Sequence, residues 1–257
     1  MKSVEHPILM NVAFAASAMG RMYRRQPMAE ERLPFTVRVV RSEEALHKAV
    51  AIRQAAYARH VPELAATLGT PEAHDHEAGS IVLLAESKLD DSAVGTMRIQ
   101  TNRFRDLAIA QSVDLPAWLK NKRMAEATRL GVGLGRTGRL VKTVLFKALY
   151  LHCVEEGIEW IVIGARSPLD RQYEALLFQD VYPGQFSPLR HAGNILHRVL
   201  AFEVGTAEAR WVEANHPLYK FMVQTRHPDL ELGDSNCSIQ NIPLRTAELL
   251  ARAASRA

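Results

Sequence analysis

The sequence predicts a single domain of mixed α/β class, in which helices flank a central mixed sheet. Its 257 residues are 47% hydrophobic and 23% charged, which is typical of a globular protein with a sizeable core. Stretches with a strand period alternate with stretches of helical period, and no segment repeats another. We expect the domain at residues 35–234, between an N-terminal extension at 1–34 and a C-terminal tail or helix at 235–257.

The first elements of the expected domain are a strand and two helices. Residues 35–40 alternate in β-branched side chains, which predicts a strand. Ser42 and the two glutamates after it are typical of a helix start, and apolar residues at helical spacing extend that helix through about residue 59. A shorter helical stretch follows at 62–68, and 69–78 has the composition of a polar loop.

The middle of the chain predicts three strands, a helix and a fourth strand. Residues 80–86 and 93–101 form a hairpin around a polar turn, and a third strand is expected at 124–132. The apolar face of the next stretch predicts a helix at 139–156. Residues 158–164 are continuously apolar, as in a strand that is buried on both faces.

The last elements complete a mixed order rather than a repeated strand-helix-strand series. We expect a helix near 169–178, a polar loop at 182–193, a strand near 199–204 and a helix near 206–212. In the doubly wound nucleotide-binding fold, a glycine turn follows the first strand. Here the glycine turn comes after several strands, so that fold is disfavoured.

The positive charge of the chain is concentrated in two places. The formal net charge is +4, and residues 1–41 alone account for it. Within the balanced remainder, one basic stretch at 120–147 holds a single acidic residue, Glu126. Because these cations are not interleaved with aromatic residues, we expect no nucleic-acid partner. The basic run at 21–25 could give a weak association with an anionic membrane surface.

Cysteine and histidine spacing argues against a metal site and a disulfide framework. The two cysteines, Cys153 and Cys237, form no ligand motif, and no further ligand is spaced to complete a site with His74 and His76. Two cysteines in 257 residues favour a reducing, cytoplasmic location. Residues 8–19 are too short an apolar run to span a bilayer as a helix, although a secretory signal is an alternative.

Four glycines lead directly into the expected central helix, at Gly131, Gly133, Gly135 and Gly138. Such a turn can present backbone N–H groups and the positive end of a helix to an anion such as phosphate. Cations on the first turns of the helix favour that function over a turn of purely structural use: these are Arg136, Arg139 and Lys142. A Walker-type loop is excluded, since no Gly-Lys-Ser/Thr sequence follows.

Several motifs, taken in order, resemble the GNAT acetyltransferase superfamily. They are Arg53-x-x-x-Tyr57, Met97-Arg98-Ile99, Glu126-Ala-Thr-Arg129-Leu130 and Gly133-x-Gly135, with Asp75 at the place of an acidic loop. The glycine signature departs from the family pattern at its leading position, which falls on Leu130. The resemblance covers about residues 35–229 and is greatest to two acyl-carrier-protein-dependent branches, the N-acyl amino acid synthases and the N-acyl-homoserine lactone synthases.

The resemblance implies an acyl-phosphopantetheine donor, from acyl carrier protein or acyl-CoA, and no tightly bound cofactor. The donor-binding residues would be Leu130, Gly131, Val132, Gly133, Gly135, Arg136, Gly138, Arg139 and Lys142. Amide formation from a thioester needs a base, and we expect Glu126 in that role. Arg98 and Arg129 would order the acidic loop through Asp75 or hold Glu126. Arg53 and Tyr57 would support the substrate loop.

The expected function is transfer of a long-chain fatty acyl group from acyl carrier protein to the α-amine of an amino acid such as tyrosine. The lactone synthases usually carry a Trp after the first-helix pair and a second aspartate in the loop, whereas this chain has Val61-Pro62-Glu63 and His76-Glu77. These departures favour an N-acyl amino acid synthase. The alternatives are a lactone synthase and, in another class, a catalytically inactive acyl-binding module.

Overall fold

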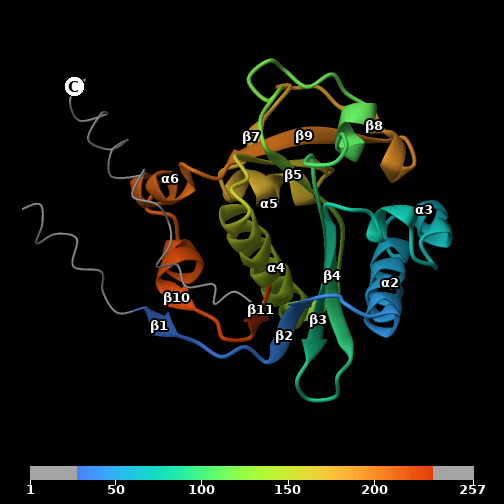
Figure 1. Ribbon diagram of the computed structural model, residues 1–257, viewed down its shortest axis with the longest axis vertical. Coiled ribbons are helices and arrows are strands. Elements are labelled where there is room, and N and C mark those ends of the chain that lie inside the picture. Colours follow the sequence, from blue (N-terminus) through green and yellow to red (C-terminus); the bar gives the residue numbers. More distant parts are fainter. Residues whose placement is uncertain (1–27, 234–257) are drawn as a thin grey trace, which may run out of the picture.

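The computed structural model describes residues 28–233, which form a nine-stranded mixed sheet with helices on both faces (Figure 1). A separate two-stranded sheet joins β1 (Ala29–Glu30) to β10 (Thr225–Arg226). In order across the large sheet, the strands are β11 (Leu230–Glu231), β2 (Phe35–Val39), β3 (Ser80–Ser87), β4 (Ala93–Thr101), β5 (Met124–Val132), β6 (Trp160–Ala165), β9 (Ile195–Glu203) and β7 (Gln179–Asp180), with β8 (Ser187–Leu189) also paired to β9. This order confirms the expected mixed α/β class.

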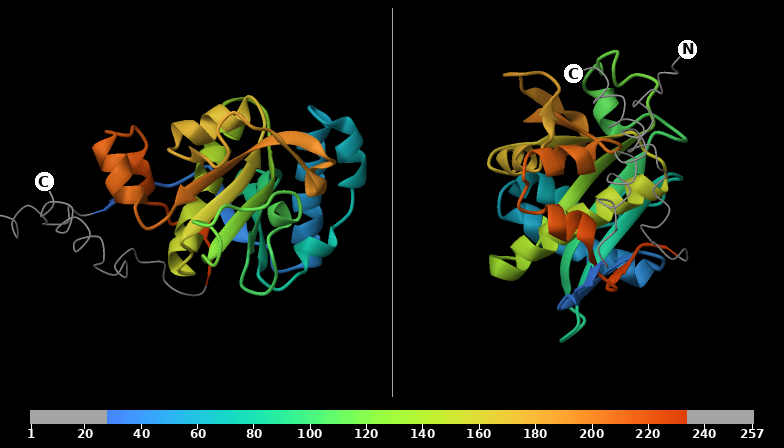
Figure 2. Two further views of the ribbon diagram at one scale, coloured as in Figure 1. Left: turned by 90° about the horizontal axis from the view of Figure 1, so that it is seen from above. Right: turned by 90° about the vertical axis from the view of Figure 1, so that its left-hand side faces the viewer.

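Two long helices enclose the central strands from opposite sides (Figures 1 and 2). Helix α2 (Glu43–Ala58) and helix α4 (Gly135–Glu155) each contact β3, β4 and β5. The other α-helices of the described residues are α3 (Pro62–Thr67), α5 (Leu169–Ala175) and α6 (Ala207–Glu213), and a π-helical turn lies at Lys220–Gln224. Ser42 caps α2 by accepting a hydrogen bond from the amide of Ala45, which confirms the helix start expected from the sequence.

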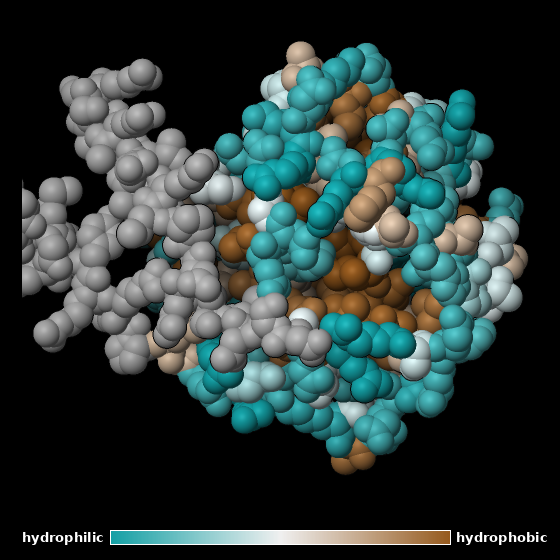
Figure 3. All heavy atoms as spheres, in the orientation of Figure 1, coloured by the Kyte–Doolittle hydropathy of each residue, from teal (hydrophilic) through white to brown (hydrophobic). Residues whose placement is uncertain are grey.

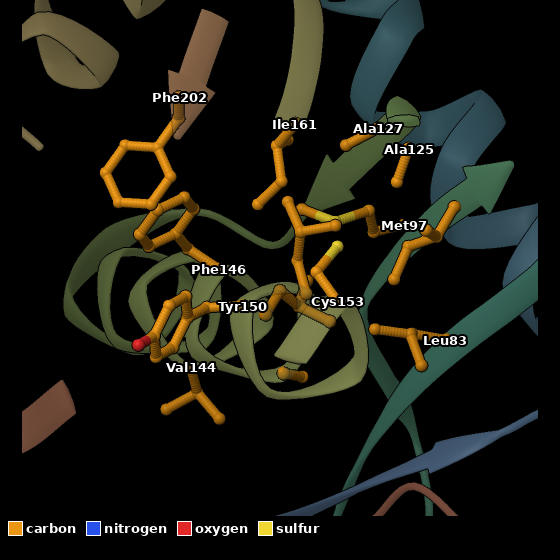
Figure 4. Packing of buried hydrophobic residues seen from close by; sticks show 14 of the residues in the cluster. Leu83, Met97, Ala125, Ala127, Val144, Phe146, Tyr150, Cys153, Ile161 and Phe202 are labelled. Carbon is orange, nitrogen blue, oxygen red and sulfur yellow. The ribbon is translucent and has the colours of Figure 1, made fainter. Parts of the chain in front are cut away.

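Strand alternation separates an apolar face from a polar face at the centre of the sheet. Met97, Ile99, Ala125 and Ala127 belong to the core that packs against α4, and Figure 4 shows Met97 and the two alanines beside Cys153 of that helix. Successive side chains of a strand point to opposite faces. The polar residues between them therefore face α2 and its loops, and Glu126 is one of these residues.

Strands β5 and β6 part in the middle of the sheet. They pair in parallel only over Met124–Glu126 and Trp160–Val162, although β5 continues to Val132 and β6 to Ala165. Beyond Glu126, β5 keeps its antiparallel partner β4, and β6 keeps its partner β9. The sheet thus opens next to Glu126.

A β-bulge interrupts β5 just after the parting. The register jumps from the Arg98–Thr128 pair to the Thr96–Gly131 pair, so that Arg129 and Leu130 together oppose one residue of β4. Arg129 has a φ of 54°, in the left-handed region that non-glycine residues seldom adopt. The bulge turns local backbone groups of β5 out of the ladder.

The helix expected at 139–156 begins at Gly135, four residues earlier than predicted. Gly138 therefore lies in the first turn of the helix, where an added Cβ would lie 1.9 Å from the carbonyl oxygen of Gly133. Glycine is a poor helix former in isolation, so the sequence favoured a longer turn. The close contact between Gly138 and Gly133 explains why glycine occupies a helical position here.

The expected strand at 199–204 begins at Ile195, and the expected polar loop at 182–193 contains β8 and a 3₁₀ turn at Arg190–Ala192. Pairing between β8 and β9 stabilises this hairpin, which sequence periodicity did not indicate. Residues 1–27 and the tail expected at 235–257 lie outside the described residues. No helix within 28–233 is long and apolar enough to cross a membrane.

Gly131 is expected to be essential for the close packing of α2 on β5. A Cβ at this position would lie 3.0 Å from the Cα of Arg53 and 3.2 Å from the Cβ of Ala56. Gly131→Ala should lower the free energy of unfolding by about 1–3 kcal/mol, because neither backbone can move away cheaply. Chemical denaturation measures this loss. Gly205→Ala is the matched control, since a Cβ there meets nothing within 4 Å; equal effects of the two changes would contradict the packing argument.

Candidate active site

The N-terminus of α4 presents backbone N–H groups that no side chain caps within the described residues. Leu134 occupies the cap position, and Gly135 follows with a φ of 76° and open space around the position of a Cβ. The amide of Gly133 is already used, since it donates to the carbonyl oxygen of Val94 at 3.0 Å. Free amides at the positive end of a helix form a site for an anion.

Fewer cations of the basic stretch at 120–147 are free to bind a ligand than the sequence indicated. Several of its members already have partners: Lys120 with Asp114, Lys122 and Arg123 with Glu159, Lys142 with Gln172, and the buried Lys147 with the carbonyl oxygens of Phe221 and Thr225. Within residues 28–233, Arg136 and Arg139 form no ion pair and are exposed. These two cations remain free at the start of α4.

Glu126 lies fully buried on β5, at the point where β6 diverges. Its Oε2 accepts a hydrogen bond from the amide of Ile109 at 3.0 Å, and its Oε1 lies 3.4 Å from Nε2 of His191. The second contact is close, but it is not aligned as a hydrogen bond. Burial raises the pKa of Glu126 to about 7, against the lowering effects of the Ile109 amide and Arg98. This carboxyl can therefore accept and release a proton near neutral pH.

His191 is a residue of this site that the sequence did not reveal. It belongs to the 3₁₀ turn after β8, and its carbonyl oxygen accepts a hydrogen bond from Nη2 of Arg129 at 2.8 Å. Burial first, and then the positive charge of Arg129, lower the pKa of His191 to about 4. The imidazole is therefore uncharged beside Glu126 at neutral pH. No motif surrounds His191 in the sequence, so only the folded hairpin indicates its position.

Three arginines and two carboxylates form an ionic cluster beside Glu126, which we call the arginine cluster. Asp75 binds both Nη atoms of Arg53 at 2.9 Å and Nη1 of Arg98 at 3.2 Å. Glu72 accepts hydrogen bonds from Nε and Nη2 of Arg129 at 2.6 Å. It also accepts hydrogen bonds from Arg53 and Arg98. The cluster fastens the loop of Glu72 and Asp75 to β4 and β5.

The charges of the arginine cluster keep both carboxylates ionised. Burial alone would raise the pKa of Glu72, but Arg129, Arg98 and Arg53 outweigh it and lower that pKa. For Asp75, burial is again outweighed, chiefly by the hydrogen bonds and charge of Arg53. The cluster holds three positive charges against two negative ones, so its excess charge also favours an ionised Glu126.

For Arg98 and Arg129 the sequence left two alternatives open, ordering of the acidic loop through Asp75 or contact with Glu126. The structure shows contact with the loop: Arg98 pairs with Asp75 and Glu72, whereas Arg129 pairs with Glu72. Tyr57 lies beside Arg129, on the side of α2. Glu72 was not predicted, although a second acidic residue three positions before Asp75 was a usable signal. Since Glu72 supplies a second loop carboxylate, the lack of an aspartate at 76–77 no longer separates the two synthase branches.

Apolar side chains reach the surface between α4 and α2, near β4, and polar residues surround them (Figure 3). Phe178 and Phe202 pack in the core with ring centroids 4.9 Å apart, whereas Phe186 is exposed. The described residues contain no group of three or more His, Cys, Asp or Glu side chains that could hold a metal ion.

Comparison with solved structures defines the fold class. The chain resembles FeeM, an N-acyl amino acid synthase from uncultured soil microbes, with a TM-score of 0.58 and 17% identity over 73% of this chain and 97% of that one. It also resembles BjaI, a CoA-dependent acyl-homoserine lactone synthase, with a TM-score of 0.50 and 14% identity over 84% of this chain and 99% of that one. No protein-family model and no curated protein sequence matches the chain.

These likenesses show that the chain shares its fold, a mixed central sheet flanked by helices, with these two proteins. Both structural neighbours are described as synthases, one of an N-acyl amino acid and one of an acyl-homoserine lactone. The parting of β5 and β6 and the uncapped start of α4 are the features of this fold that position the candidate site.

Proposed function

We propose that this chain is an N-acyltransferase that moves a long-chain fatty acyl group from a phosphopantetheine thioester to the α-amine of an amino acid. The observation that carries the proposal is Glu126: a buried carboxyl with a pKa of about 7, at the point where two parallel strands part. A carboxyl tuned to neutral pH can remove the proton of an attacking amine.

The donor half of the proposed site lies at the start of α4. The phosphate of the donor would meet the free amides at Leu134–Gly138, with Arg136 and Arg139 beside them. The pantetheine arm would follow β5 into the parting. Backbone N–H groups of β5 near the bulge, at Leu130–Val132, would stabilise the oxyanion.

We favour acyl carrier protein over CoA as the donor. Two exposed cations, Arg136 and Arg139, stand beside two exposed leucines, Leu134 and Leu140, which gives a mixed basic and apolar surface at the mouth of the site. Such a surface fits an acidic carrier protein whose own face is partly apolar. BjaI is described as CoA-dependent, so CoA is the alternative donor.

The reaction forms a C–N bond and breaks a C–S bond. The amine arrives as an ammonium ion, and its nitrogen loses two protons on the way to the amide. Glu126 accepts the first, either directly or through one water, and the free amine attacks the thioester carbonyl. The oxyanion then collapses, and the leaving thiolate takes the second proton to become a thiol. Oε1 of Glu126 is the free acceptor, because Oε2 is occupied by the amide of Ile109.

A lactone synthase is the second candidate. The observation that favours it is the pair of loop carboxylates, Glu72 and Asp75, together with the likeness to BjaI. An amino acid acceptor, for which tyrosine is our first choice, remains the main proposal because Val61-Pro62-Glu63 stands where the lactone synthases usually carry a Trp. A cytoplasmic location stays a prediction.

Lipid extracts of a bacterium that overproduces the chain separate the two candidates. We expect N-acyl amino acids in the mass spectrum of the extract, at a much lower level in cells that carry the Glu126→Gln variant. Acyl-homoserine lactones in place of N-acyl amino acids would establish the second candidate. The variant is the control for products that the host makes by itself.

A further inference from the structure

Three polar side chains stand directly opposite one another across the centre of the sheet. Ser80 of β3 pairs with Gln100 of β4, and Gln100 pairs with Glu126 of β5. Directly opposed residues project from the same face, with Cβ atoms about 4.5–5.5 Å apart. They therefore form one continuous row on the face that carries α2, from the parting of the sheet to the start of β3. We call it the polar row.

Each member of the polar row has a buried polar atom without a hydrogen-bond partner among the described residues. These atoms are Oγ of Ser80, both amide atoms of Gln100 and Oε1 of Glu126, and Nδ1 of His191 adds another at the Glu126 end. Gln100 is 1% exposed and Glu126 is 0% exposed. Buried polar atoms nearly always have a partner, and ordered water supplies it where protein does not. Five such atoms in one place indicate bound water.

The proposed reaction needs a route for one proton. At neutral pH an amino acid arrives as an ammonium ion, so thioester plus ammonium gives amide plus thiol plus one proton. Glu126 receives that proton in a position with no exposure to solvent. The face of the sheet that packs against α4 is apolar. The guanidinium groups of Arg98 and Arg129 lie on the opposite face, which carries α2. The proton must leave between these two barriers before the next cycle.

We propose that Ser80 and Gln100 hold a file of water molecules that carries the proton from Glu126 to the surface beside Ser80. Ser80 is partly exposed, and its amide donates to the carbonyl oxygen of Glu77, whose carboxylate pairs with Arg105 near the surface. Ser80 and Gln100 are positioning residues here, because they orient water and do not touch the reacting atoms. This inference rests on the proposed function.

The groups that face Glu126 come from four elements. They are Gln100 and Arg98 of β4, Arg129 of β5, the backbone of Ala108 and Ile109, and His191 of the turn after β8. The two arginines repel an excess proton, and His191 has a pKa of about 4, so it does not hold one at neutral pH. Gln100 connects Glu126 across the sheet to Ser80, which is partly exposed.

The kinetic test replaces the middle of the polar row with an apolar side chain of similar size. Gln100→Leu should lower kcat about tenfold or more at neutral pH and leave the KM for the acyl donor unchanged. The defect should shrink as pH rises, because more amine then arrives without its extra proton. Ser80→Ala, at a partly exposed position, should show the same pattern more weakly.

The matched control is Thr96→Val. Thr96 lies on the same strand and face and is fully buried, but its hydroxyl already donates to the carbonyl oxygen of Leu83 at 2.8 Å. This change should leave the pH profile of kcat as in the wild type. A wild-type pH profile in both row variants, or the same kcat loss in Gln100→Leu at all pH values, would overturn the relay.

A second test does not depend on the identity of the substrate. A high-resolution crystal structure of the wild type should show ordered waters that bridge Ser80, Gln100 and Oε1 of Glu126. A polar row without ordered water, in which the side-chain amide of Gln100 is hydrogen-bonded to protein groups, would overturn the inference. If the waters are present but the protein makes no acyl product, the proposed function fails while the hydrated row stands as a structural finding and the relay is overturned.

Discussion

Glu126→Gln is expected to lower kcat by about 10²–10⁴-fold, the range in which a positioned general base contributes. The amide keeps the size of the side chain and can still accept from the Ile109 amide, but it cannot take a proton from the amine. The donor contacts lie at the start of α4, so the KM for the acyl donor should stay close to that of the wild type. Steady-state kinetics of the purified variant measures both constants.

The same variant should be at least as well folded as the wild type above neutral pH. The pKa of Glu126 is about 7 in the folded chain and about 4.5 in an unfolded one. A raised pKa stabilises the fold below pH 4.5, and this contribution is lost as pH rises through 7. Gln does not titrate, so its stability relative to the wild type should rise by up to about 3 kcal/mol between these pH values. Denaturation at several pH values measures the trend.

Glu86→Gln is the matched control for the charge change. Glu86 lies at the end of β3, which β4 separates from β5, and it pairs there with Lys48 and Arg38. Its kcat should remain near that of the wild type. Full activity of Glu126→Gln would remove Glu126 as the base. A wild type without activity on any acyl donor would instead favour an acyl-binding module.

Asp75→Asn is expected to lower the free energy of unfolding by about 3–5 kcal/mol, the cost of breaking a buried ion pair from one side. The side chain of Asp75 is fully buried and binds Arg53 with both oxygens. Its loss leaves three guanidinium groups facing Glu72 alone. Arg53→Met leaves two arginines against two carboxylates, so the charge balance improves and the loss should be smaller. Urea denaturation of both variants gives the comparison.

An exposed pair is the control for the arginine cluster. Glu159→Gln removes a surface partner of Lys122 and should cost less than about 1 kcal/mol. If Asp75→Asn cost no more than Arg53→Met, the charge balance of the cluster would not control its stability. The loop of Glu72 and Asp75 would then be held by packing instead.

The fold was predictable where side-chain periodicity is strong. The strands at 80–86, 93–101 and 124–132 and the helix capped by Ser42 lie where alternation and capping chemistry placed them. The predicted start of α4 was wrong because glycine has a low helix propensity. Only the close contact with Gly133 explains why a glycine is required at position 138. Local patterns do not carry such a contact.

The site was predictable to the extent that it lies on regular elements. Arg53, Arg98, Glu126 and Arg129 lie on one helix and two strands, at spacings that resemble a known family. His191 and the amide of Ile109 come from irregular turns, and they reach Glu126 only because the β8–β9 hairpin and the segment before β5 fold over it. Their sequence neighbours show no pattern that predicts this.

The central claim is acyl transfer from a thioester to an amine at Glu126. The most direct measurement incubates the purified protein with an acyl thioester, on carrier protein or CoA, and a set of amino acids. It then compares the released thiol with the mass of the product. We expect one equivalent of N-acyl amino acid for each thiol, and formation of both products about 10²–10⁴-fold more slowly with Glu126→Gln. Thiol release without an N-acyl product, or equal rates from the variant, would contradict the claim.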